Sequence, residues 1–169
     1  MDATKLKVWL PFDESTTADK CGNTWTTYGS PTISATNAIN GNALQLNGSS
    51  YLQMDGSITL GGKDFSIDGW FNLSSSTGNW PRVFALFNTT NSDANSIQLQ
   101  RREKTTNFRV CCNGSFSDTF SVSLGTRHHF ELDYVHSTST VYAFIDGALM
   151  KTFAKAMDAT NYAIVSLGL

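Results

Sequence analysis

Hydrophobic and polar residues alternate along most of the chain, whereas the spacing typical of amphipathic helices is hard to find. In the clearest stretch, Phe65 to Leu73, every second residue is apolar or glycine, as in a β-strand with one buried face. Similar patterns occur at residues 7–12, 43–46, 51–54, 83–87, 97–100, 108–110, 120–124, 128–134, 141–145 and 163–167. Turn residues separate these stretches, and Asp146-Gly147 is a hairpin signal. The pattern predicts one all-β domain over residues 1–169, an antiparallel two-sheet β-sandwich.

The composition of the chain excludes several classes of function. Charged residues make up only 15% of the chain, and the 52 Ser, Thr and Asn residues supply most of the polar surface instead. A net charge of −2 excludes nucleic-acid binding driven by phosphate contacts and binding to a membrane surface through basic residues. No apolar run is long enough to span a bilayer, so we expect no membrane insertion. Cys21, Cys111 and Cys112 form no disulfide framework, and we expect free thiols.

Several strings along the chain occur in the order seen in a known family. The strings are Val8 to Asp13, Gly41 to Gly48, Asp64 to Trp70, His128 to Phe130, and Val141 to Gly147. This succession resembles the laminin-G-like jelly-roll domains of the concanavalin A-like lectin/glucanase superfamily. The resemblance implies a jelly-roll β-sandwich over nearly the whole chain. It does not fix the function, because the superfamily contains lectins, glycosidases, adhesion modules and virion proteins.

The chain departs from the family pattern at two places. Arg127 precedes the His-His pair, where the family often has tryptophan, and no closing strand of the type Gly-x-Ile-Asp-Glu-x-Arg-Ile follows Leu169. An unpaired strand edge exposes backbone hydrogen-bonding groups and apolar surface. We therefore expect the domain to lack its closing C-terminal strand, which either a protein partner or the chain's own missing strand would supply at the open sheet edge.

Catalysis is the least expected activity. The glucanases of the superfamily carry Glu-x-Asp-x-x-Glu on one strand, which supplies the two carboxylates of a retaining glycoside hydrolase. Here Glu131-Leu132-Asp133 is followed by His136 in place of the last carboxylate. We therefore predict that the protein is not an enzyme and has no catalytic residues.

Calcium is a candidate cofactor through the resemblance, because members of the superfamily often bind it at the rim of the sandwich. Asp13 lies where these domains carry an acidic residue after the first strand, and it is the expected metal ligand. Asp19 and Asn23 follow in the next loop, but the chain has no compact Asp-x-Asn-x-Asp array.

Sugar binding requires an exposed aromatic ring for stacking and polar groups that contact hydroxyls. One candidate region is the loop that contains Asn79, Trp80 and Arg82. The other is a polar strand face, expected to form one groove if its strands are neighbours in one sheet. Its candidate ligand-binding residues are Asp68, Trp70, Gln98, Gln100, Arg102, Arg109 and Tyr142. Trp25 and Tyr28, expected in a loop over residues 23–30, are weaker candidates.

Two functions fit these observations. The first is a non-catalytic, lectin-like recognition module that binds a glycan or surface polysaccharide at a cell or virion surface. The second is a structural or attachment module of a multi-chain assembly, such as a phage virion decoration or tail protein. The first residues contain no signal peptide. Either the chain acts where it is made, or a leader has been removed, or the chain leaves the cell by lysis inside a particle. From the two functions above we expect a place outside the cell or on a virion surface.

Overall fold

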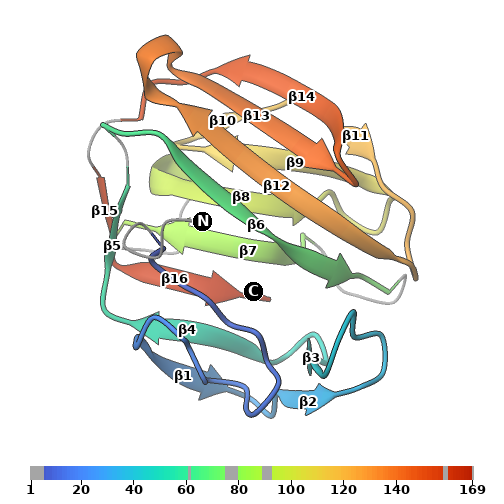
Figure 1. Cartoon of the computed structure of the whole chain (residues 1–169). Helices are drawn as coiled ribbons and strands as arrows, with labels where there is room; N and C mark the ends of the chain where they lie inside the picture. The colour runs from blue at the N-terminus through green and yellow to red at the C-terminus, as the bar shows by residue number, and fades with distance from the viewer. Residues whose placement is uncertain (1–5, 61, 75–79, 89–92, 158–159, 169) are drawn as a thin grey trace.

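Two antiparallel β-sheets pack face to face in the computed structural model of the protein (Figure 1). The structure describes residues 6–60, 62–74, 80–88, 93–157 and 160–168. Within these residues the only helical segments are two single 3₁₀ turns, Asp93–Asn95 and His136–Thr138. The predicted fold class, an all-β sandwich, is confirmed. None of the described helical segments is long enough to cross a membrane.

The larger sheet has the strand order β1-β4-β16-β7-β8-β9-β10, with β11 also paired to β9. Its strands are β1 (Thr24–Tyr28), β4 (Tyr51–Asp55), β7 (Arg82–Phe87), β8 (Ser96–Arg101), β9 (Asn107–Cys112), β10 (Ser115–Phe116), β11 (Phe120–Ser121) and β16 (Ile164–Leu167). The last strand, β16, pairs with β4 on one side and β7 on the other. It therefore joins the first and second halves of the chain within one sheet.

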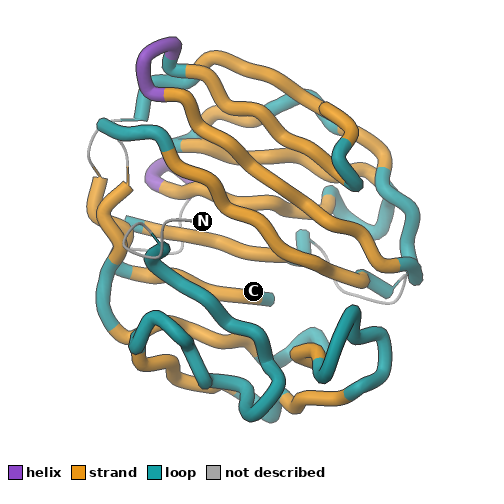
Figure 2. The backbone as a smooth tube through the Cα atoms, in the orientation of Figure 1, coloured by secondary structure: helices purple, strands orange, loops and turns teal. Residues whose placement is uncertain are grey.

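The smaller sheet has the strand order β14-β13-β12-β6 and covers one face of the larger sheet (Figure 2). Its strands are β6 (Phe65–Asn72), β12 (Arg127–Val135), β13 (Thr140–Ile145) and β14 (Ala148–Ala154). Two short ladders complete the described fold, β2 (Thr32–Ser34) with β3 (Ala43–Gln45), and β5 (Ile58–Leu60) with β15 (Thr160–Tyr162).

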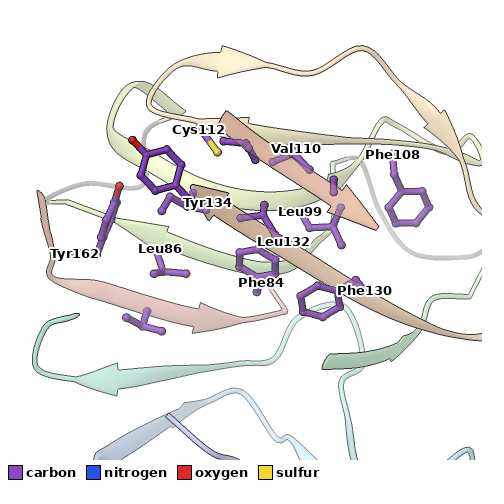
Figure 3. Packing of buried hydrophobic residues seen from close by; sticks show 14 of the residues in the cluster. Phe84, Leu86, Leu99, Phe108, Val110, Cys112, Phe130, Leu132, Tyr134 and Tyr162 are labelled. Carbon is purple, nitrogen blue, oxygen red and sulfur yellow. The ribbon is translucent and has the colours of Figure 1, made fainter. Parts of the chain in front are cut away.

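The core fills the space between the sheets, because alternate residues of facing strands point toward each other (Figure 3). Phe84 of the larger sheet stacks on Phe130 of the smaller sheet with ring centroids 5.2 Å apart. Leu132 and Leu99 are buried beside them at 2% and 3% exposure. Burial of a side chain of this size contributes about 1.5–3 kcal/mol, so this alternating apolar set accounts for much of the stability of the sandwich.

Two local predictions are wrong. Residues 7–12 form no strand ladder, because the N–H and C=O of Trp9 bond instead to Asp19 and Lys20 of the following loop. Residues 24–28, predicted as loop, form strand β1, because Trp25 fills the core and the strand pairs with β4 along its length. The three cysteines are free, as expected.

Candidate functional site

Polar side chains gather on the outward face of the larger sheet, the face opposite the core. Strand β8 alternates, so that Ile97 and Leu99 enter the core while Gln98 and Gln100 point outward. Yet Gln98 and Gln100 are only 0% and 1% exposed, because other polar and aromatic groups cover them. We call this group the arginine–amide cluster. Its members are Trp80, Arg82, Asp93, Ser96, Gln98, Gln100, Arg109 and Phe116.

Hydrogen bonds connect the cluster from β7 across β8 to β9. The side-chain oxygen of Gln98 accepts from Arg82 Nε at 2.5 Å and from Gln100 Nε2 at 3.0 Å. Its Nε2 donates to Asp93 Oδ1 at 2.6 Å and to Ser96 Oγ at 2.7 Å. The buried amide groups are therefore satisfied by each other, as buried polar atoms must be.

Arg109 extends this network to two aromatic rings. Its Nε donates to Gln100 Oε1 at 2.9 Å, which holds the side chain in place. The centre of its guanidinium lies 3.7 Å from the ring centroid of Phe116 and 4.7 Å from that of Trp80. Such cation–π contacts fix the plane of the guanidinium. Within the described part of the chain, its two terminal nitrogens have no hydrogen-bond acceptor.

The charge of Arg109 persists despite its partial burial. Burial lowers the pKa of Arg109, and the negative charge of Asp93 opposes that shift. A guanidinium starts from so high a pKa that it remains protonated in proteins. The site therefore presents a fixed positive charge beside aromatic rings, with two terminal nitrogens that no described residue accepts from.

A second aromatic group lies on the same face, at the other end of the larger sheet. Tyr28 of β1 stacks on Tyr51 of β4 with centroids 4.5 Å apart and an interplanar angle of 9°. Gln53 of β4, Ser166 of β16, Ala85 of β7 and Gln98 of β8 are paired side by side across the sheet. Ser166 and Ala85 are both small and fully buried. Along this row of paired residues, small side chains therefore lie between Gln98 and the tyrosine pair.

The structure brings together only part of the predicted site. Trp80 and Arg82 of the loop region meet Gln98, Gln100 and Arg109 of the strand region. These five predicted residues all belong to the arginine–amide cluster. Asn79 lies outside the described residues. The exposed Arg102 lies in the turn after β8, where its N–H donates to the carbonyl oxygen of Asn107.

The expectation of one continuous polar groove is wrong. Asp68, Trp70 and Tyr142 belong to β6 and β13, which are strands of the smaller sheet, whereas Gln98 and Arg109 belong to the larger sheet. The two sheets share the core, so their outward faces lie on opposite sides of the sandwich. Trp70 is 56% exposed there, with its ring 5.0 Å from that of His129.

Residues that the sequence reasoning missed complete the cluster. Phe116 follows the Asn113-Gly114 turn, in which both residues have positive φ, and β10 then places it opposite Cys111. Asn-Gly between alternating segments is a strong hairpin signal and could have identified this pairing. Asp93 had no such signal, because its role depends on contacts with Gln98 and Arg82 from neighbouring strands.

The acidic residues near the N-terminus have different roles. Asp19 accepts hydrogen bonds from the N–H groups of Trp9 and Cys21 and from the side chains of Asn23 and Trp25. Burial raises its pKa, but these bonds outweigh burial, and the pKa of Asp19 falls below its ordinary value. Asp13 is exposed in a neighbouring bend. Among the described residues no three His, Cys, Asp or Glu side chains are grouped as metal ligands, so calcium at Asp13 stays a prediction.

Comparisons with known proteins identify the class. The profile of the laminin-G-like family, described as the concanavalin A-like lectin/glucanases superfamily, matches residues 46–168. The chain therefore belongs to this family. No curated protein is detectably similar in sequence.

Solved structures share the fold at low sequence identity. Domain 4 of AbnA, an extracellular arabinanase of Geobacillus stearothermophilus, in complex with arabinotriose, has a TM-score of 0.66 and 14% identity over 89% of this chain and 77% of its own. The receptor-binding domain of botulinum neurotoxin type G has a TM-score of 0.60 and 12% identity over 88% of this chain. This chain spans only 39% of that toxin domain. A carbohydrate esterase of the Shiga toxin-encoding bacteriophage phi24B has a TM-score of 0.56 and 15% identity, over 96% of this chain and 90% of its own.

Proposed function

We propose that the protein is a non-catalytic recognition module that binds a glycan on the outward face of the larger sheet, at the arginine–amide cluster. The observation that carries this proposal is the contact of the Arg109 guanidinium with the rings of both Trp80 and Phe116. A sugar presents an apolar ring face and several hydroxyl groups. Aromatic rings can stack on the apolar ring face of the sugar, and a fixed guanidinium can donate hydrogen bonds to its hydroxyl groups.

The named ligands of structural neighbours support this class of ligand. The AbnA domain is named in complex with arabinotriose, and a binding domain of botulinum neurotoxin DC is named in complex with SialylT. Both share this fold, with TM-scores of 0.66 and 0.57.

The arrangement of carboxylates favours binding without a covalent step. Within the described part of the cluster, Asp93 is the one carboxylate, and Gln98 and Arg82 hold it. Glycoside hydrolysis by the common mechanisms requires a pair of carboxylates, one of them an acid. Glu131 and Asp133 belong to β12 of the smaller sheet and face away from the cluster.

A glycan array tests the proposal with the wild-type chain and two matched variants. Arg109→Ala removes the guanidinium, and we expect a loss of about 10- to 100-fold in affinity, the value of one or two charged hydrogen bonds. Trp70→Ala removes an exposed aromatic residue on the opposite sheet and should leave affinity unchanged. Thermal unfolding confirms that both variants fold. Wild-type protein that binds no glycan, or binding that depends on Trp70 instead of Arg109, would refute the proposal.

A second candidate function is attachment within a multi-chain assembly, with a location outside the cell or on a virion. The edge of β6, which has a neighbour on one side only among the described strands, favours it. The two functions are compatible, because the edge and the arginine–amide cluster belong to different sheets.

A further inference from the structure

Arg109 is a cation that no described carboxylate neutralises. None of the ion pairs among the described residues includes it. Asp93, the one carboxylate in the described part of the arginine–amide cluster, contacts Arg82 Nη2 at 3.8 Å instead. Residues 75–79 and 89–92 adjoin the cluster in the sequence but consist only of Ser, Thr, Gly and Asn. No acidic side chain from these parts of the chain therefore balances the charge of Arg109.

The surroundings of Arg109 carry an excess of positive charge. Burial lowers the pKa of Arg109, and the positive charge of Arg102 lowers it further, while Asp93 opposes both effects. The cluster and the turn after β8 hold more basic residues, Arg82, Arg102, Lys104 and Arg109, than acidic residues, Asp93 and Glu103. This excess is local, because the net charge of the whole chain is −2.

The guanidinium of Arg109 is held in one orientation. Its Nε donates to Gln100 Oε1 at 2.9 Å, and Gln100 Nε2 donates in turn to Gln98 Oε1. The ring centroids of Phe116 and Trp80 lie 3.7 Å and 4.7 Å from the centre of the guanidinium. Its terminal nitrogens, Nη1 and Nη2, are the groups without an acceptor among the described residues. Two parallel N–H groups of a guanidinium match the two oxygens of a carboxylate.

A neutral ligand would leave this charge uncompensated. A sugar that stacks on Phe116, which is 39% exposed, would displace water from the guanidinium beside it. Removing water from a charge is costly unless a partner of opposite sign takes its place. A hydroxyl group replaces the hydrogen bond but not the charge, whereas a carboxylate replaces both. The site therefore favours an anionic sugar over a neutral sugar of the same shape.

We propose that the glycan bound at the arginine–amide cluster is acidic, and that both oxygens of one of its carboxylates accept hydrogen bonds from Nη1 and Nη2 of Arg109. The ring of the same sugar unit contacts Phe116 and Trp80. Gln100 acts as a positioning residue, because its hydrogen bond to Nε sets the direction in which the terminal nitrogens point. This inference rests on the proposed function and adds the charge of the ligand to it.

A glycan array on the full 169-residue chain tests the charge of the ligand. The array carries uronic acid and sialic acid glycans, each printed beside its carboxyl-reduced form, together with sulfated and neutral glycans. We expect the wild-type chain to bind carboxylate glycans, and carboxyl reduction to lower the affinity about 10- to 100-fold, the value of one or two charged hydrogen bonds. Affinity for the acidic form should also fall as salt rises from about 0.05 to 0.5 M, because salt screens the attraction.

Two variants with the same change in net charge locate the contact. Arg109→Gln should lower the affinity for the strongest acidic glycan about 10- to 100-fold. It should cost much less with the carboxyl-reduced form, because the two changes remove the same contact. Arg127→Gln is the matched control, because Arg127 belongs to the smaller sheet and its guanidinium donates to the carbonyl oxygen of Ala38. It should change the affinity by less than about twofold.

Wild-type binding that is equal for the acidic and the carboxyl-reduced forms, or that is confined to neutral or to sulfated glycans, would overturn the proposal. Additive losses from Arg109→Gln and carboxyl reduction, or an equal loss in Arg127→Gln, would overturn it as well. The wild-type comparison is decisive even if thermal unfolding shows that Arg109→Gln fails to fold. A chain that binds only neutral glycans, through Arg109, would keep the proposed function and refute this inference alone. A chain that binds no glycan would refute both.

Discussion

Replacing Gln98 with leucine should disconnect the arginine–amide cluster. Gln98 takes part in four side-chain hydrogen bonds, with Arg82, Gln100, Asp93 and Ser96. Leucine has a similar volume but can make none of them. The substitution therefore tests whether the buried amides form a supporting network for Arg109 or are incidental to it.

The expected cost follows from the exposure of the four partners. Arg82 and Asp93 have side chains that are 19% and 42% exposed, so water can replace much of what they lose. Ser96 and Gln100 are 0% and 1% exposed. Gln100 is left with an unmet donor, whereas Ser96 Oγ loses one donor but keeps its contacts with the carbonyl oxygen of Asp93 and with Cys111 Sγ. An unsatisfied buried group costs about 1–3 kcal/mol, so Gln98→Leu should lower the free energy of unfolding by about 2–4 kcal/mol.

Urea denaturation measures this change, with Gln53→Leu as the control. Gln53 is half-buried on the same face of the larger sheet and makes no side-chain hydrogen bond to another described residue. Its replacement should change the free energy of unfolding by less than about 0.5 kcal/mol. Equal stability of the two variants would show that the amide network contributes nothing, and the reasoning would fail.

Four further predictions concern other parts of the molecule. Hydrogen bonds hold the pKa values of Asp19 and Asp146 below normal, so the free energy of unfolding should fall as pH drops below about 4, and less steeply in Asp19→Asn. Gly29→Ala, at φ +68° with its new Cβ 2.8 Å from a backbone oxygen, should cost about 1–3 kcal/mol in a thermal unfolding assay. A thiol reagent should label only the exposed Cys21 in folded protein and all three cysteines after unfolding. Added calcium should raise the melting temperature of wild-type protein but not of Asp13→Ala, and an equal response would remove Asp13 as the ligand.

The alternation of apolar residues was sufficient to predict the sandwich but not the neighbours of each strand. Strand β6 was predicted from its own pattern, and the structure places it there. Strand β1 was missed, because Trp25 is its only buried residue and Thr residues surround it. Residues 7–12 have the pattern of a strand, but no strand of the described chain lies beside them. The alternation of apolar residues indicates which side chains are buried. Which strands pair with each other depends on residues far away in the sequence.

The sequence predicted several residues of the candidate site but not which of them lie together. The polar residues of β6 and of β8 show the same alternation, so the sequence could not assign them to different sheets. The contact of Arg109 with Trp80 joins a strand to a loop almost thirty positions away, and no local signal records it.

The arginine–amide cluster contains both buried and accessible polar groups, and this difference limits which of them can contact a ligand. Gln98 and Gln100 are buried, and both are bonded within the network. If these amides were to hydrogen-bond a sugar hydroxyl, they would first have to break existing hydrogen bonds, so the net gain in binding free energy would be small. The terminal nitrogens of Arg109, which have no acceptor among the described residues, and the 39% exposed Phe116 carry no such cost. A ligand should therefore contact the arginine and the aromatic rings, while the amides act indirectly by fixing the guanidinium in place.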